Sequence, residues 1–190
     1  MLPQPWIMSW YKSSVKKHGW RGWVKNLATS NRGMRIGTDV HGLIEGFIKK
    51  EQYEANPKYN SHAIADALYD AVNPRIEDYL ALEPHLVSNR LRIHGTADVV
   101  VRLDHGEGLA IVDWKTGASK SETHPIQLAI YAMCWNEMNP GLQVDRGLIA
   151  RVDKKTKALN VHIDDYKGLK QYYPVVEALR TIWSYTNENT

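Results

Sequence analysis

One short segment, LAIVDWKTG at residues 109–117, constrains the fold of this chain more than any other. Its first four residues are apolar, which is typical of a buried strand. Asp113 and Lys115 follow, and Thr116-Gly117 then turns the chain into a loop. Residues two apart on a strand share a face, so Asp113 and Lys115 project together while Trp114 points to the other side. The segment therefore predicts a buried strand that ends in an acid and a lysine.

The hydrophobic periodicity of the remaining sequence predicts helices and further strands around this segment. Helices are expected over residues 37–50, 61–80, 125–138 and 165–185, with Asn73-Pro74 bending or restarting the second. Strands are expected over residues 83–87, 92–103, 109–114, 147–152 and 158–163, the first three being joined by hairpins. Helices before, inside and after a run of strands can cover both of its faces. We therefore predict an α/β fold with a central mixed β-sheet flanked by helices on both faces.

Length and composition exclude several classes of protein. A chain of 190 residues suits one domain over residues 1–190, and 43% hydrophobic with 24% charged residues is typical of globular proteins rather than disordered or fibrous ones. No apolar run approaches the roughly 20 residues of a membrane-spanning helix, and the N-terminus lacks a secretory signal, so we expect no membrane partner. The single Cys134 fits a reducing compartment and excludes an iron–sulfur cluster, so any metal must use oxygen and nitrogen ligands.

Charge divides the chain into a basic, Trp-rich N-terminal segment (1–35) and a core (36–190). Of the formal net charge of +3, the segment carries +7 without a single acid, which leaves −4 for the core. Cations interleaved with flat rings suit single-stranded nucleic acid, since the cations meet phosphates and the rings stack on bases. The residues expected to bind DNA here are Lys16, Lys17, Trp20, Arg21 and Trp23. The alternative is that the Trp residues pack a helix onto the core while the Lys residues remain in water.

Two carboxylates on adjacent predicted strands indicate a metal site. Asp98 in HGTADVVV and Asp113, with the Trp114 carbonyl, offer a cage of hard oxygens that suits Mg²⁺ or Mn²⁺. Lys115 would then orient or help deprotonate a water activated by the metal, and offset charge on a scissile phosphate. The alternative for an acid-x-Lys pair is an exposed salt bridge. Burying two carboxylates without a cation is unfavourable, which favours a site with a partner.

Three further side chains have both a structural and a functional interpretation. His41 lies beside the apolar stripe of the first predicted helix, where it is either a packed residue or a nitrogen ligand of a nearby metal. Gln127 and Tyr131 are four residues apart on the helix after DWK, so both can reach over the same edge of the sheet. The tyrosine could equally belong to the core.

Five motifs in order resemble the RecB-type branch of the PD-(D/E)XK nuclease superfamily: GTxxH at 37–41, Glu83, GTxD at 95–98, IVDWKTG at 111–117 and QLxxY at 127–131. The set is similar to mitochondrial genome maintenance exonucleases and phage RecB-like exonucleases. The resemblance implies a restriction-endonuclease-like fold and metal-dependent cleavage of DNA phosphodiesters, commonly from an end and often on single strands. By position it implies the following roles: Asp98, Asp113 and the Trp114 carbonyl as metal ligands, His41 as a further ligand preferring Mn²⁺, Lys115 as the catalytic lysine, Glu83 as a supporting or second-metal carboxylate, and Gln127 and Tyr131 as DNA contacts or braces.

Departures from that family restrict the predicted function. The four-cysteine iron–sulfur clamp of some relatives is impossible here, and no GxxxxGK[ST] motif is present, so ATP is not expected as a cofactor. The protein would need a free end, a gap, or a helicase or recombinase partner. The resulting prediction is a metal-dependent DNA exonuclease of replication, repair or recombination, cytoplasmic in a bacterial or phage-infected cell. The alternatives are a non-catalytic DNA-binding or recombination accessory protein and a hydrolase of small phosphoesters.

Overall fold

The computed structural model describes residues 32–153 and 159–188. A first helix is described over residues 32–49 and is called the N-terminal helix below. The other elements are α2 (Ser61–Val72), β1 (Ile76–Leu82), β2 (His85–Ser88), β3 (Ile93–Thr96), β4 (Val99–Leu103), β5 (Leu109–Lys115), α3 (His124–Met138), β6 (Val144–Asp153), β7 (Asn160–Lys167) and α4 (Tyr173–Glu188). Short 3₁₀ turns are η1 (Asn73–Arg75), η2 (Asp104–Gly106) and η3 (Leu169–Tyr172).

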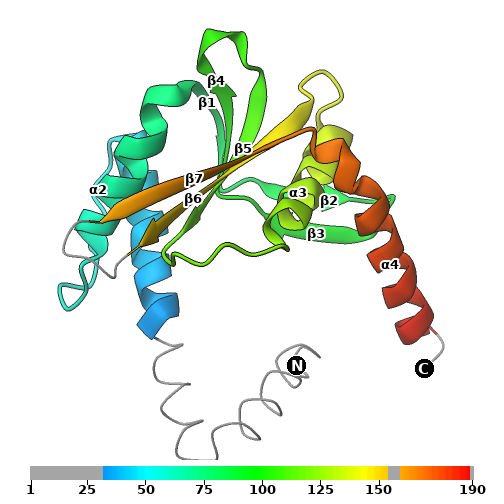
Figure 1. The fold of residues 1–190 in the computed structure, drawn as a ribbon, viewed down its shortest axis with the longest axis horizontal. Helices are drawn as coiled ribbons and strands as arrows, with labels where there is room; N and C mark the ends of the chain where they lie inside the picture. The colour runs from blue at the N-terminus through cyan, green and yellow to red at the C-terminus, as the bar shows by residue number, and fades with distance from the viewer. Residues whose placement is uncertain (1–31, 154–158, 189–190) are drawn as a thin grey trace, which may run out of the picture.

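Five strands form one mixed sheet in the order β1-β4-β5-β6-β7. The β5–β6 pair is parallel and the other pairs are antiparallel. Parallel neighbours need a crossover, and α3 supplies it between β5 and β6. The strands β2 and β3 form a separate antiparallel ribbon, which extends from the centre of the molecule toward α4 (Figure 1).

Alternating side chains of the central strands bury both faces of the sheet. Val99 and Val101 of β4 lie in a cluster with the N-terminal helix and α2, whereas Val100 lies in a second cluster with α3. The same alternation in β5 places Val112 with the first cluster and Ile111 with the second. The N-terminal helix and α2 therefore cover one face, and α3 covers the other (Figure 1).

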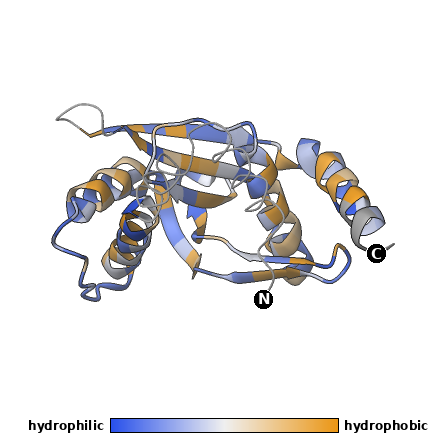
Figure 2. Ribbon diagram, turned by 90° about the horizontal axis from the view of Figure 1, so that it is seen from below, coloured by the Kyte–Doolittle hydropathy of each residue, from blue (hydrophilic) through white to orange (hydrophobic). Residues whose placement is uncertain are grey.

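Hydropathy follows this layered arrangement. Residues coloured as hydrophobic are frequent in the central strands, and the coloured part of the outer helix α4 carries both hydrophobic and hydrophilic residues (Figure 2). In the part of the chain that the structure describes, no helix is both long and apolar enough to span a bilayer.

One predicted helix proves to be half strand. The prediction of a helix over residues 61–80 is wrong beyond Val72, because η1 with Pro74 ends α2 and residues 76–82 form β1. In β1, Tyr79 lies opposite Val101 and Leu82 opposite Val99 of β4. The local pattern of residues 76–82 is compatible with a helix, but pairing with the distant strand β4 makes this segment a strand.

Two other predicted boundaries are also wrong. The predicted strand over 92–103 is two strands, because the chain leaves the β2–β3 ribbon after Thr96 and joins the main sheet at Val99. The last helix does not begin at 165, since β7 continues to Lys167 and Gly168, with a φ of 69°, ends it. The predicted α/β class, a mixed sheet with helices on both faces, is confirmed.

Candidate active site

The end of β5 presents a buried carboxylate next to an ammonium group. Asp113 shares its face of β5 with Ile111, which packs beneath α3, and Trp114 packs on the opposite side. The Asp113 residue is only 2% exposed, and its Oδ2 lies 2.6 Å from Nζ of Lys115. Two-residue spacing on the strand therefore brings the acid and the lysine together.

The second carboxylate lies where the chain enters β4. Oδ2 of Asp98 accepts a 2.7 Å hydrogen bond from the backbone amide of Trp114, which joins this residue to the end of β5. His41 projects from the N-terminal helix with Nδ1 3.2 Å from Oδ1 of Asp98 and Nε2 3.1 Å from the Trp114 carbonyl oxygen. The imidazole thus bridges a carboxylate that precedes β4 and a backbone carbonyl of β5.

The helix α3 contributes an amide and a phenol to the same region. Nε2 of Gln127 lies 3.2 Å from Oδ1 of Asp113 and 3.0 Å from the hydroxyl of Tyr131, so the amide can donate to both oxygens. The four-residue spacing places both side chains on one face of α3. The Tyr131 ring lies against Gly95 of β3, where a Cβ would be 3.0 Å from Cε1 of the ring. A glycine in β3 therefore makes room for the aromatic ring.

Burial and neighbouring charges shift the pKa values of Asp113 and His41. Burial and the negative charge of Asp98 raise the pKa of Asp113 to about 6, although Lys115 and His41 act in the opposite direction. Burial acts to lower the pKa of His41, but the hydrogen bond and charge of Asp98, together with the Trp114 carbonyl and the charge of Asp113, raise it overall. The site therefore concentrates negative charge that a cation would stabilise.

Glu83 lies beside the His41–Asp98 pair. Its backbone amide donates a 2.8 Å hydrogen bond to the Asp98 carbonyl oxygen, and its φ is 44°. Glu83 and His41 also line an open pocket of about 530 Å³, and Glu45 lines it from the next turn of the N-terminal helix. The structure thus adds Glu45 to the residues near the candidate site, and the Glu45 carboxylate pairs with the Lys49 ammonium. The sequence indicates this placement by the four-residue spacing between His41 and Glu45, which puts both on one face of the helix.

The donor chemistry of these residues fits a hard divalent cation. The site offers two carboxylates, a peptide carbonyl and an imidazole, and the buried Oδ2 of Asp113 already faces a positive charge, the Lys115 ammonium at 2.6 Å. Within residues 32–153 and 159–188, however, no three His, Cys, Asp or Glu side chains are already placed as a metal-ligand cluster. Asp98 faces His41 and the Trp114 amide, while Asp113 faces Lys115 and Gln127. The fit is therefore one of donor type rather than of a preformed cage.

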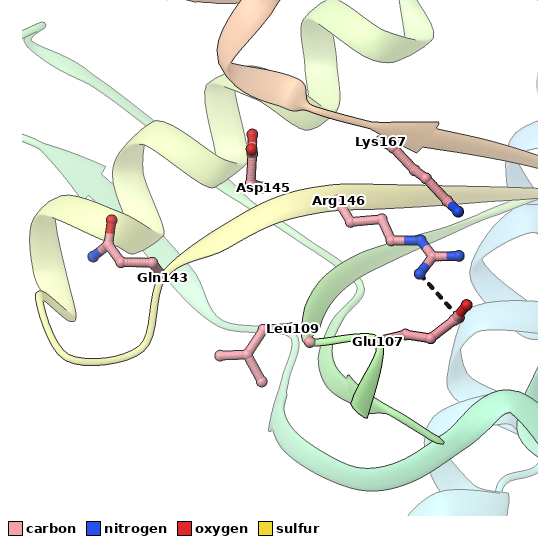
Figure 3. Close-up of a pocket in the computed structure, with 7 residues that line it drawn as sticks. Glu107, Leu109, Gln143, Asp145, Arg146 and Lys167 are labelled. Atoms are coloured by element: carbon pink, nitrogen blue, oxygen red, sulfur yellow. Dashed lines mark hydrogen bonds and ion pairs between the residues drawn. The ribbon is translucent and has the colours of Figure 1, made fainter. Parts of the chain in front are cut away.

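A second cavity, of about 460 Å³, lies at the opposite end of β5 and β6 (Figure 3). Arg146 points to Glu107 there, at 2.9 Å, and also pairs with Asp165 at 2.7 Å. Leu109, at the start of β5, lines this cavity, whereas Asp113 and Lys115 stand at the end of the same strand. Its arginine already has carboxylate partners, so this cavity is not the candidate active site.

The structure brings eight of the predicted site residues into one region: His41, Glu83, Asp98, Asp113, Trp114, Lys115, Gln127 and Tyr131. The predicted DNA-binding residues of the N-terminal segment lie outside the described residues: Lys16, Lys17, Trp20, Arg21 and Trp23.

Arg151, a basic residue beside Lys115, was not among the site residues predicted from the sequence. Arg151 of β6 lies opposite Lys115 in the parallel register, and its Nε is 2.5 Å from Oδ2 of Asp164. His124, at the start of α3, is buried, and burial together with Lys115 and Arg151 lowers its pKa. The signal in the sequence is the order strand, helix, strand over residues 109–153. If the two strands are read as parallel neighbours, Arg151 falls at the same end of the sheet as Lys115.

Comparison with known proteins identifies a family and structures with a similar fold, of which one is described here. The family model for the PD-(D/E)XK nuclease superfamily matches residues 58–181. A crystal structure of a protein from Eubacterium rectale, named "Putative exonuclease", aligns with a TM-score of 0.50 and 12% sequence identity. The alignment covers 83% of this chain and 68% of that protein, and at this identity the likeness concerns the fold. No curated protein matches the sequence.

Proposed function

This chain belongs to the PD-(D/E)XK nuclease superfamily, and we propose that it is a metal-dependent deoxyribonuclease of the RecB-like exonuclease branch. The observation that carries the proposal is the buried Asp113 carboxylate, 2.6 Å from the Lys115 ammonium at the end of β5. Asp98 binds the Trp114 amide at the same end of β5, and Asp98, Asp113 and Lys115 have the order of acids and lysine that the resemblance to the superfamily implies. Superfamily members generally use divalent metal ions.

We assign the metal ligands to Asp98, Asp113, the Trp114 carbonyl and His41. When bound, Mg²⁺ or Mn²⁺ supplies Lewis-acid activation of the scissile phosphodiester and of the attacking water. For His41 to become a ligand, one ring nitrogen must turn from its present oxygen partner toward the ion. Glu83 lines the same pocket as His41 and Glu45 and adds a carboxylate near these ligands.

The side chains around the ligands have separate tasks. Lys115 places a positive charge beside the scissile phosphate and orients the attacking water. Its ammonium has a fixed position because it pairs with Asp113. Gln127 fixes the direction of the Asp113 carboxylate through the 3.2 Å contact with Oδ1. Tyr131 holds Gln127 in turn, through the 3.0 Å contact with the phenol oxygen. A positioned carboxylate loses less conformational freedom when substrate and cation bind.

The proposed substrate is DNA with a free end, preferentially single-stranded. The basic, Trp-rich residues Lys16, Lys17, Trp20, Arg21 and Trp23 suit a single strand, although they lie outside the described residues. No ATP-binding motif occurs in the sequence, so ends or gaps must be supplied by other events, or by a helicase or recombinase. Replication, repair and recombination all provide such substrates.

Substitution of the two central residues tests the catalytic assignment. Asp113→Ala and Lys115→Ala should abolish cleavage of a labelled oligonucleotide in Mg²⁺ or Mn²⁺ while leaving DNA binding largely intact. Asp66→Ala, an exposed acid on α2, is the matched control and should cleave like the wild type. Full activity in either site variant would remove the assignment. A wild type that binds DNA but never cleaves it with added metal would instead indicate the accessory protein.

A second experiment concerns the type of cleavage. Single- and double-stranded substrates labelled at either end should be followed over time. An exonuclease releases labelled mononucleotides or short products from one end first, whereas an endonuclease yields internal fragments from the start. Competition with a small phosphoester measures selectivity, and cleavage of that ester in preference to DNA would favour the phosphoesterase alternative.

His41 has its own test. If the imidazole is a ligand, His41→Ala should reduce Mg²⁺-supported and Mn²⁺-supported cleavage by clearly different factors, because nitrogen donors suit Mn²⁺ better than Mg²⁺. Equal, mild losses with both ions would return the residue to a packing role between the N-terminal helix and β5.

A further inference from the structure

A groove between β3, α3 and α4 lies next to the candidate active site. It has a volume of about 350 Å³ and two kinds of lining residue, none of them acidic. Its aliphatic lining consists of Ile93, Ile130, Val176 and Leu179. Its basic lining consists of Arg92, His94 and Arg180. A surface of this kind suits a ligand that is both anionic and partly apolar.

The groove is linked to the proposed site through β3 and α3. Ile93 lines the groove and shares a face of β3 with Gly95, against which the Tyr131 ring lies. Ile130 also lines the groove and precedes Tyr131 on α3. The Tyr131 hydroxyl contacts Gln127, which reaches Asp113. The ribbon β2–β3 runs from the centre of the sheet toward α4 (Figure 1). A strand held at Asp113 would therefore meet the groove next along β3.

We propose that this groove is the binding path for the single strand of DNA that extends from the scissile phosphate. Arg92 and His94 are exposed and would meet its phosphates, while Leu179, which is 49% exposed, and Ile130 would lie against base faces. Arg180 is already held by the Leu91 carbonyl, at 2.6 Å from its Nε, so its charge has a fixed place beside the path. The inference rests on the proposed nuclease function and adds where the substrate strand lies.

An acidic segment of another protein would match the same charge and apolar floor. The groove lies next to the Tyr131–Gln127–Asp113 contacts, which favours DNA over a protein segment. A DNA strand cleaved at Asp113 must continue past these residues, whereas a protein segment has no reason to bind beside the active site. Glu177 of α4 does not line the groove, and its carboxylate pairs with Arg90 at 2.9 Å. The two occupants are separated by the experiment below.

The test measures DNA binding by the full chain without metal, so that cleavage does not interfere. Fluorescence anisotropy is recorded with single strands of about 4 and about 16 nucleotides, the range over which single-strand sites extend. Leu179→Glu should weaken binding of the long strand by at least about fivefold, which corresponds to losing one base contact. Arg92→Gln should lower the salt dependence of long-strand binding by about 0.7 in log–log slope, the value for one phosphate contact. Binding of the short strand should not change in either variant.

Val175→Glu is the matched control. Val175 lies one turn before Leu179 on α4, is 41% exposed and does not line the groove, so this variant should bind both strands like the wild type. Equal long-strand affinity in the wild type and Leu179→Glu would overturn the proposal. So would a glutamate- and leucine-rich peptide that binds the wild type and not Leu179→Glu, while the long strand binds both equally.

Failure of the proposed function would give a different result. If the wild type shows the length-dependent, Leu179-dependent binding but cleaves no DNA with Mg²⁺ or Mn²⁺, the binding path stands and the nuclease assignment fails. If the wild type cleaves DNA and neither groove variant changes long-strand binding, the nuclease assignment stands and the binding path fails.

Discussion

Asp98 and Trp114 are joined by a 2.7 Å hydrogen bond from the Trp114 amide to Oδ2 of the carboxylate. The bond spans two strands, since Asp98 stands just before β4 and Trp114 lies on β5. The other carboxylate oxygen faces His41 on the N-terminal helix, 3.2 Å away. One side chain assigned to the metal thus also connects two strands and a helix.

Two substitutions at Asp98 separate its structural role from its catalytic role. Asp98→Ala leaves the partly buried Trp114 amide without its acceptor, so the free energy of unfolding should fall by about 1–3 kcal/mol. Asp98→Asn keeps an oxygen acceptor for that amide and should recover most of the loss, measured by urea denaturation. Neither variant should cleave DNA. Equal destabilisation by Ala and Asn would show that the charge, and not the hydrogen bond, holds the strands together.

The chemistry at the end of β5 was predictable because it depends on local spacing. Two-residue periodicity in 109–115 places Asp113 and Lys115 on one face, and four-residue spacing on α3 aligns Gln127 with Tyr131. Both relationships follow from the geometry of a single element. The structure gives the contacts that the spacing allows, 2.6 Å for the first pair and 3.0 Å for the second.

The features that escaped prediction depend on contacts between distant segments. Residues 76–82 have a pattern that a helix can accept, and only pairing with β4 makes them a strand. Asp98 was expected within a strand, but it lies at the passage from the β2–β3 ribbon to the main sheet, where the Glu83 amide binds its carbonyl oxygen at 2.8 Å. Arg151 meets Lys115 only through the parallel register of β5 and β6. Long-range pairing of this kind leaves a weak trace in a single sequence.

Gly95 is expected to be required because of the ring that covers it. A Cβ at this position would lie 3.0 Å from Cε1 of Tyr131, so Gly95→Ala must displace the ring and weaken its contact with Gln127. Overpacking of this kind costs about 1–3 kcal/mol of stability, and the cleavage rate should fall as well. The effect should be measured in a double-mutant cycle, by urea denaturation.

The second background of that cycle is Tyr131→Ala. With the ring removed, Gly95→Ala should become neutral or stabilising by about 0.5–1 kcal/mol, since glycine in a strand is less favourable than alanine. An unchanged cost of Gly95→Ala in this background would show that the backbone of β3, and not the Tyr131 ring, requires the glycine.

The N-terminal segment is predicted to contribute to strand binding. Removal of the residues before Arg35 should weaken single-strand binding and flatten its dependence on salt, because each lost phosphate contact lowers the log–log slope by about 0.7. A milder variant replaces Trp20 and Trp23 by Ala and should weaken binding while leaving the slope unchanged. Identical affinity of the full and shortened chains at several salt concentrations would favour the alternative in which this segment packs on the core.

Asp165 is predicted to make stability depend on pH, away from the candidate active site. Its oxygens lie 2.9 Å and 2.7 Å from Nε and Nη2 of Arg146, and Arg75 donates to it at 2.8 Å. Hydrogen bonds from Arg146, then from Arg75, lower the pKa of Asp165 to about 2, although burial acts in the opposite direction. Because the pKa is about 3.9 in an unfolded chain, the charged form stabilises the fold above that pH and this contribution is lost as the pH falls toward 2.

Asp165→Asn should therefore lower the free energy of unfolding by about 1–2 kcal/mol at pH 7, a value reduced for partial exposure of the pair. The difference from the wild type should shrink below pH about 4, as the wild-type carboxylate itself becomes protonated. Urea denaturation at a series of pH values measures it, with Asp66→Asn as the exposed control that should show no difference. If the difference between wild type and Asp165→Asn stays constant from pH 7 to pH 3, the side chain acts through packing. A contribution from the carboxylate charge would instead decrease over this range, because the charge is lost on protonation.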